Sequence, residues 1–209
     1  AALVTFYNED MFAAAGVKPF ETGWKWDDLV SIGKKFVQDT DGDGTPDQYA
    51  IHLRSDYWPV KLKADTDHVV TDNYFAPKKY LLTEKASIDS IQEYYDYWLV
   101  HKVAPTTEQT TQVKDYFMAG KAAMIIVGAW NQPKYISSIT NFKWNLSPLP
   151  IGDSGKEYNR GDGSCFAISA HTKEKEASFR FVYYLAGPTG KGVEILLDRQ
   201  QMLPALIEA

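Results

Sequence analysis

The chain has 209 residues, of which 44% are hydrophobic and 23% are charged, with a formal net charge of −5. This composition is typical of a globular protein, and its acidic balance argues against a partner that needs a basic face, such as nucleic acid or an anionic membrane. The single cysteine, Cys165, excludes an intramolecular disulfide, and no run of about 20 apolar residues predicts a membrane-spanning helix.

The first predicted element is a strand over residues 1–7, whose apolar run is typical of a strand interior. Because chains seldom begin inside a buried strand, we expect the sequence to be cut from a longer protein, with any export signal in the missing part. Apolar residues at helical spacing predict a helix over 24–38, and residues 49–53 predict a short strand. Residues 56–85 are mixed in pattern, with Pro59 as one of their breakers.

The second half of the chain alternates helical and strand patterns. An amphipathic helix is predicted from Ser87 to about residue 101, followed by a helical turn over 113–118. The later predictions are strands over 122–127, 144–149 and 166–168, and helices over 172–185 and 189–197. Helices that alternate with short strands predict an α/β architecture, and residues 161–163 are the best candidate for a hinge or an internal boundary.

Sequence motifs for catalysis are missing from the chain. It has no phosphate-binding loop with a final Lys-Ser or Lys-Thr, no H-E-x-x-H and no G-x-S-x-G. Its four histidines never fall at metal-ligand spacing. A pair of carboxylates brought together by the fold at glycosidase distance stays open.

An Asp-rich loop separates the helix predicted over 24–38 from the following strand. Its possible calcium ligands follow the alternate spacing of a calcium loop and are Asp39, Asp41, Asp43, Thr45 and Asp47. Gly44 occupies the sixth position, but Ala50 replaces the bidentate Glu of the twelfth. The pattern therefore fits either a structural calcium site or a tight turn with solvated acids.

Five runs of sequence, taken in order, carry a resemblance to a known family. They are residues 5–16 (TFYNEDMFAAAG), 26–29 (WDDL), 41–49 (DGDGTPDQY), 117–130 (FMAGKAAMIIVGAW) and 161–185. In their order and spacing these runs resemble family 1 extracellular solute-binding proteins, the group that includes maltose-binding proteins. The resemblance spans nearly the whole chain.

The resemblance implies an α/β fold of the periplasmic-binding-protein-like type II, present here as a fragment comprising mainly one lobe. Residues 1–160 would form most of the C-terminal lobe with its hinge strand, and residues 161–209 would return to the N-terminal lobe. The implied function is capture of a carbohydrate, an oligosaccharide, in a cleft between lobes for delivery to the permease of an ABC importer. The implied location is extracellular or periplasmic, with a lipid anchor on a segment outside this sequence. Neither catalysis nor a required cofactor is expected.

Candidate ligand-binding residues combine placement with this resemblance. Trp130 follows a buried strand through Gly128, so we expect it at a strand end, where α/β proteins bind ligands; it also falls on the family's stacking tryptophan. The other candidates are Tyr57 and Trp58 for stacking, and Asp56, Asp162 and Asn131 for sugar hydroxyls. Each candidate also has a structural alternative. The aromatic residues could pack in the core, the aspartates could form turns, and Asn131 could cap the next helix.

Other functions remain open at this point. The same aromatic and acidic residues suit a glycan-active enzyme or an accessory carbohydrate-binding module. Facing carboxylates in a closed pocket would favour the enzyme. A calcium-stabilised interaction domain is a third reading. Peptide and polyamine ligands also stay open.

Overall fold

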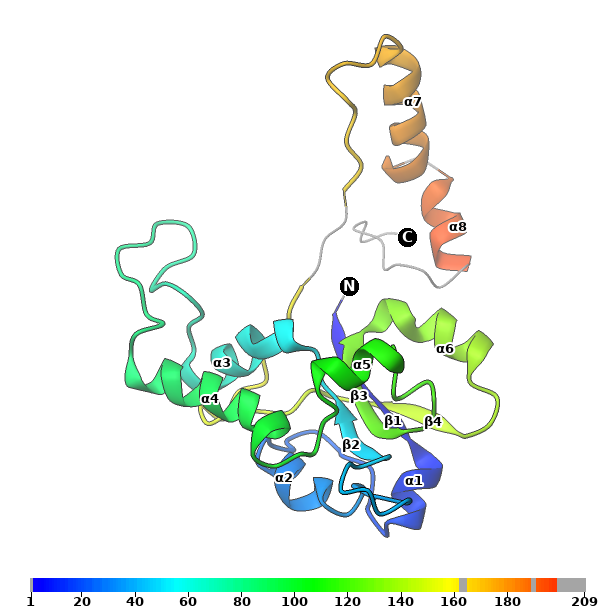
Figure 1. The fold of residues 1–209 in the computed structure, drawn as a ribbon. Coiled ribbons are helices and arrows are strands. Elements are labelled where there is room, and N and C mark those ends of the chain that lie inside the picture. Colours follow the sequence, from blue (N-terminus) through cyan, green and yellow to red (C-terminus); the bar gives the residue numbers. More distant parts are fainter. Residues whose placement is uncertain (1, 162–164, 189–190, 199–209) are drawn as a thin grey trace.

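A four-stranded mixed sheet lies at the centre of the computed structural model, which describes residues 2–161, 165–188 and 191–198 (Figure 1). Its strands are β1 (Leu3–Asn8), β2 (Tyr49–His52), β3 (Ala122–Gly128) and β4 (Trp144–Ser147), in the order β2-β3-β1-β4. β1 runs antiparallel to both β3 and β4, whereas β2 is parallel to β3. The carboxyl ends of β2 and β3 therefore lie at the same edge of the sheet.

The described helices lie around this sheet, except the last two, which stand apart from it (Figure 1). The helices are α1 (Glu9–Ala14), α2 (Asp28–Gly33), α3 (Trp58–Thr66), α4 (Lys85–Leu99), α5 (Thr107–Gln112), α6 (Gln132–Ser138), α7 (Lys175–Ala186) and α8 (Gly192–Asp198). Two 3-10 turns, η1 (Ser55–Tyr57) and η2 (Ala129–Asn131), directly follow the sheet edge that β2 and β3 share. No helix in the described parts of the chain is long and apolar enough to cross a membrane.

The apolar core has two parts because neighbouring side chains of a strand point to opposite faces of the sheet. Met124 and Ile126 of β3 belong to the larger cluster, which also holds side chains from α1, α2 and α4. Ile125 and Val127 belong to the smaller cluster, which includes Tyr135 of α6. The fully buried run of β3 therefore stabilises both layers, and it fixes the strand ends relative to α6.

The predicted α/β class is confirmed, as are the strands expected over 1–7, 49–53, 122–127 and 144–149. The helix expected from Ser87 is α4, and the helix expected over 172–185 is α7, which begins three residues later. The helix expected over 189–197 is α8; residues 189 and 190 fall outside the described residues.

The helix predicted over 24–38 is wrong at both ends. Its first residues form a bridge with Ile151, whose amide donates to the carbonyl of Trp24 at 2.8 Å. Its last residue, Gln38, is bridged to Gln48 instead. Only α2 remains helical within this span, because tertiary hydrogen bonds at both ends compete with the helix pattern.

One other prediction is wrong, and one is confirmed with shifted bounds. Residues 166–168 are irregular rather than a strand, because no described strand lies beside them to take up backbone hydrogen bonds. The helical turn predicted over 113–118 is present as a single turn, in which the amide of Ala119 donates to the carbonyl of Asp115 at 3.0 Å, and it follows the short helix α5. α5 begins earlier because Thr106 and Gln109 form a reciprocal capping box at its start.

Candidate functional site

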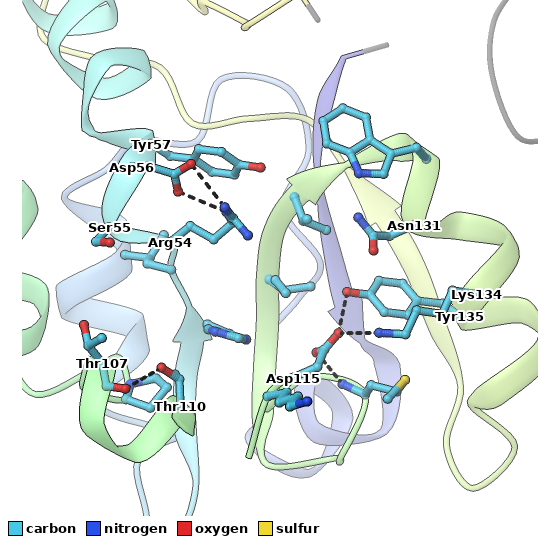
Figure 2. A pocket seen from close by; sticks show the side chains of 18 of the residues that line it. Arg54, Ser55, Asp56, Tyr57, Thr107, Thr110, Asp115, Asn131, Lys134 and Tyr135 are labelled. Atoms are coloured by element: carbon cyan, nitrogen blue, oxygen red, sulfur yellow. Dashed lines mark hydrogen bonds and ion pairs between the residues drawn. The ribbon is translucent and has the colours of Figure 1, made fainter. Parts of the chain in front are cut away.

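A cavity of about 830 Å³ lies at the carboxyl ends of β2 and β3. Figure 2 shows its two facing walls, one built from η1 and the other from η2 and α6. Because β2 and β3 are parallel neighbours, the chain leaves both strands at this edge, and the carboxyl ends of strands are where open α/β sheets commonly bind ligands. The neighbouring α5 adds Thr107 and Thr110 to the lining.

The first wall is organised by an ion pair between neighbouring residues. The guanidinium of Arg54 donates to both carboxylate oxygens of Asp56, at 3.0 and 3.1 Å. Burial alone would raise the pKa of Asp56, but the hydrogen bonds and charge of Arg54 outweigh it and hold that pKa below its usual value. The ring of Tyr57 is buried and lies 5.2 Å from the Arg54 guanidinium and 5.8 Å from that of Arg160. One end of this cavity is therefore a packed guanidinium and aromatic cluster.

The second wall is centred on Asp115, whose side chain is largely buried. Its carboxylate accepts hydrogen bonds from the backbone amide of Met118 at 3.0 Å and from the hydroxyl of Tyr135 at 3.1 Å. The ammonium of Lys134 lies 3.7 Å from the same carboxylate, which is an ion pair at longer range (Figure 2). Burial raises the pKa of Tyr135 and the neighbouring Asp115 raises it further, so this hydroxyl remains a donor at neutral pH.

His52, at the end of β2, also lines the cavity and is only 8% exposed. Its Nδ1 atom is buried and has no hydrogen-bond partner. Burial lowers the pKa of His52, although the charge of Asp115 opposes this shift. The imidazole is therefore neutral at pH 7 and contributes a polar group to the cavity without a charge.

Trp130 stands at the rim of the cavity and is 39% exposed. Its ring lies over Gly128, where an added Cβ would come within 2.2 Å of three ring atoms. The amide of Asn131 donates to the carbonyl of Gly128 at 3.3 Å, so Asn131 does not cap α6 through its side chain. This arrangement leaves an indole face at the mouth of the cavity.

The sequence-based candidates are distributed unevenly. Four of them line the same cavity, because they follow the neighbouring ends of β2 and β3. These are Asp56, Tyr57, Trp130 and Asn131. Trp58 is absent from that lining and packs against the larger core cluster. Asp162 lies outside the described residues.

Other lining residues had no signal in the sequence, namely His52, Arg54, Asp115, Lys134 and Tyr135. They come from three separate segments of the chain, residues 52–54, residue 115 and residues 134–135. Only the parallel pairing of β2 with β3 and the position of α6 bring them together.

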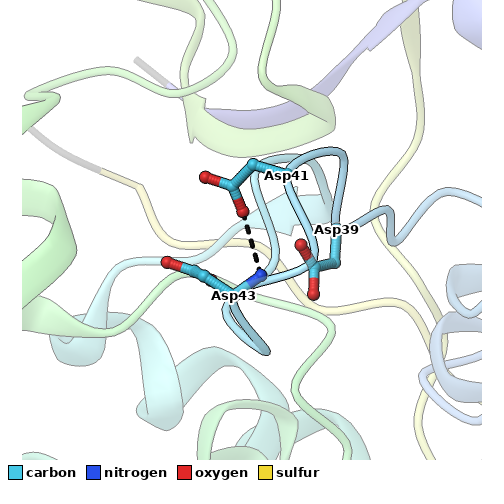
Figure 3. Close-up of side chains that lie close together, drawn as sticks. All are labelled: Asp39, Asp41 and Asp43. Carbon is cyan, nitrogen blue, oxygen red and sulfur yellow. Dashed lines mark hydrogen bonds between the residues drawn. The ribbon is translucent and has the colours of Figure 1, made fainter.

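No residue of the Asp-rich loop lines this cavity; Figure 3 shows the three clustered aspartates of the loop. Asp39, Asp41 and Asp43 each offer a carboxylate oxygen, and the three oxygens lie within 4.8 Å of one another. Asp47 instead accepts hydrogen bonds from the backbone amide and the hydroxyl of Thr40. The three exposed carboxylates also accept backbone amides of the loop, so the geometry suits an Asx turn as well as a cation.

Comparison with known proteins gives a family match and a set of related folds. The model of the bacterial extracellular solute-binding protein family matches residues 1–192. An ABC substrate-binding protein, Lmo0181 from Listeria monocytogenes in complex with cycloalternan, has a TM-score of 0.80 at 20% identity. The alignment covers 99% of this chain and 51% of that one. No curated protein matches the chain in sequence.

Two further structures show the same fold. The maltose/maltodextrin-binding domain MalE from Bdellovibrio bacteriovorus, bound to maltotriose, has a TM-score of 0.71 at 20% identity, covering 99% of this chain and 52% of that one. UgpB from Mycobacterium tuberculosis, in complex with glycerophosphocholine, has a TM-score of 0.72 at 19% identity, covering 97% and 49%. The chain thus spans about half the length of the solved structures it matches.

Proposed function

Because the chain belongs to the bacterial extracellular solute-binding proteins, we propose that it captures an oligosaccharide for an ABC importer. The observation that carries this proposal is the cavity at the ends of β2 and β3, with the exposed indole of Trp130 at its rim. A sugar offers a C–H-rich face to such a ring and hydroxyl groups to polar side chains. Cycloalternan and maltotriose, held by two of the similar structures, are ligands of this kind.

Several lining groups are suited to sugar hydroxyls. The threonine hydroxyls of α5 and the amide of Asn131 both donate and accept hydrogen bonds. Asp56 and Asp115 are held in place by their own partners and keep acceptor capacity on the carboxylate oxygens. Preorganised polar groups of this kind lose little freedom on binding, which favours affinity.

We also propose the arrangement of the whole protein. Residues 1–160 form most of one lobe, and residues 161–209 belong to a second lobe that closes over the cavity. The described α7 supports this division, because none of its residues is buried and it stands away from the sheet (Figure 1). The permease would receive the loaded protein at the membrane, with the protein held outside the cell by a lipid anchor.

The test is a calorimetric titration of the two-lobed protein with a panel of oligosaccharides. We expect saturable binding by at least one sugar, and the Trp130→Ala variant should bind that sugar about tenfold or more weakly. Its melting temperature should stay close to that of the wild type, because the indole is partly exposed. Binding of peptides or polyamines in place of every sugar would overturn the ligand class, and an unchanged dissociation constant would remove Trp130 from the site.

A glycan-active enzyme is the competing proposal, and the cavity favours binding over hydrolysis. A glycosidase needs a carboxylic acid whose pKa is raised, so that it donates a proton at neutral pH. Arg54 instead lowers the pKa of Asp56, which is therefore a carboxylate at neutral pH and has no proton to donate. Oligosaccharide that is recovered intact after long incubation with the protein would support capture, whereas cleaved sugar would support the enzyme.

We further propose a structural calcium ion in the Asp-rich loop. The convergent oxygens of Asp39, Asp41 and Asp43 support it, and Thr45 and Asp47 stand at further ligand positions of the pattern. After treatment with a chelator, about 1 mM calcium should raise the melting temperature, and the Asp41→Asn variant should lose the increase. An equal increase in that variant, or no increase at all, would leave the loop as an Asx turn.

A further inference from the structure

The cavity is basic in a protein that is acidic overall. Its described lining contains four cationic side chains, Arg54, Lys114, Lys134 and Arg160, but only two carboxylates, Asp56 and Asp115. The complete chain has a net charge of −5. A positive cavity in a negatively charged protein concentrates anions at its mouth, because field lines focus in a low-dielectric cleft.

The charge is uneven between the two walls. On the first wall, the bidentate contact with Arg54 neutralises the carboxylate of Asp56. On the second, Asp115 is the lining carboxylate beside two lysines, Lys114 and Lys134. Asp115 already accepts hydrogen bonds from a backbone amide and a tyrosine hydroxyl, and Lys134 approaches it only to 3.7 Å. This wall therefore holds more positive charge than its own carboxylate balances.

Both lysines are available to a ligand. The side chain of Lys134 is 50% exposed, and Lys114 also lies at an exposed position. Among the described residues, Lys114 has no acidic group within salt-bridge distance. An ammonium group has three donors and no acceptor, so both lysines offer hydrogen bonds that suit carboxylate or phosphate oxygens.

From this wall we infer that the captured saccharide is anionic and places a carboxylate or phosphate group against Lys114 and Lys134. The inference rests on the proposed function, since it names the class of solute that the same cavity takes. The indole of Trp130 covers a sugar ring at the rim, while the two lysines bind the charged substituent. Neutral His52 also lines the cavity and adds no charge of its own.

The experiment compares saccharides that differ only in charge. The two-lobed protein is titrated with gluco-, galacto- and manno-configured oligosaccharides, with the matching oligouronates and their methyl esters, and with hexose 6-phosphates beside the parent hexoses. We expect an anionic member to bind about tenfold more tightly than its neutral counterpart. Each of the two lysines should contribute about a threefold increase in affinity. Its affinity should fall as sodium chloride is raised. Preference for uronates over hexose phosphates, or the reverse, identifies the charged group.

Single variants assign the effect to the wall. Lys114→Gln and Lys134→Gln should each weaken the anionic ligand about threefold and leave its methyl ester or parent hexose unchanged. Lys18→Gln removes the same charge at an exposed position outside the cavity and serves as the matched control. Equal binding of neutral and charged members, without salt dependence, would overturn this inference while keeping the proposed function. Binding of no saccharide of either charge would overturn both.

Discussion

The indole of Trp130 and the backbone of Gly128 fit together so closely that a methyl group would not fit between them. An ideal Cβ at Gly128 would lie 2.1 Å from the ring atom Cζ3 and 2.2 Å from Cε3. Gly128 has φ −65° and ψ 141°, which any residue adopts, so its glycine is required by this contact and not by the backbone. The position of the Trp130 ring at the cavity rim thus depends on Gly128, which has no Cβ to occupy the same space.

Replacement of Gly128 by alanine is expected to move the indole while the sheet stays folded. The added methyl group forces the ring into another rotamer, so the dissociation constant for the captured saccharide should rise about tenfold. Calorimetry of the Gly128→Ala protein measures this, with circular dichroism to check the fold. In a Trp130→Ala background the same substitution should have almost no further effect on affinity. Additive losses in the double variant would show that Gly128 acts by another route.

Sequence reasoning identified individual site residues only where a local pattern carried the information. Trp130 was predictable because a run of buried residues ends in a glycine and an aromatic residue. Lys134 and Asp115 were not, because they sit in segments 19 residues apart and meet only through the fold. Trp58 was predicted for the site and does not line it. It neighbours Tyr57 in the chain, but it begins α3, and its ring packs against the core.

At the scale of elements, two helices that carry a proline in their first turn were not predicted from the sequence pattern. Pro59 is read as a breaker, yet it lies in the first turn of α3, and Pro133 lies in the first turn of α6. Proline is well accepted there because its missing amide has no helical partner in any case. The periodicity of α3 is also disguised, because the charged Lys61 is one of its buried residues. By contrast, α4 was predictable since its amphipathic pattern is long and regular.

Lys61 joins α3 to α4 through a buried ionic network. Its ammonium lies 2.6 Å from Asp65 on the same helix and 2.7 Å from Glu93 on α4. Burial alone would lower the pKa of Lys61, but its hydrogen bonds to both carboxylates outweigh this and raise the pKa. The lysine therefore remains charged, and Asp65, which is 7% exposed, depends on it for neutralisation.

Loss of this buried charge is expected to destabilise the protein far more than loss of a similar exposed one. Lys61→Met leaves the carboxylate of Asp65 buried without its cation, and the free energy of unfolding should fall by about 3 kcal/mol. Lys85→Met is the matched control, because Lys85 and Asp89 form an exposed pair at the same i,i+4 spacing, and it should cost about 0.5 kcal/mol or less. Urea denaturation measures both. Similar losses in the two variants would contradict a special role for the α3–α4 network.

At the scale of the whole molecule, the chain divides into a packed body and a separate pair of helices. Figure 1 shows α7 and α8 standing apart from the sheet and the helices around it. α7 has no buried residue, and four of its aromatic side chains are exposed, namely Phe179, Phe181, Tyr183 and Tyr184. An exposed aromatic surface of this kind marks a face that another part of a protein covers. The helix itself was predictable from its period, whereas its separation from the sheet was not, since no local pattern encodes it.

Hydrogen exchange tests the proposed assignment of this arm to a second lobe. A 12-residue helix without buried side chains is marginal in water, so the amides of α7 should exchange rapidly in the 209-residue chain. In the two-lobed protein the aromatic face is covered, and the same amides should exchange at least about tenfold more slowly. Amides of β3, which is buried throughout, provide the internal control and should be protected in both forms. Equal exchange of the α7 amides in the two forms would contradict the assignment of residues 161–209 to the second lobe. A helix gains protection only from the surface that it packs against.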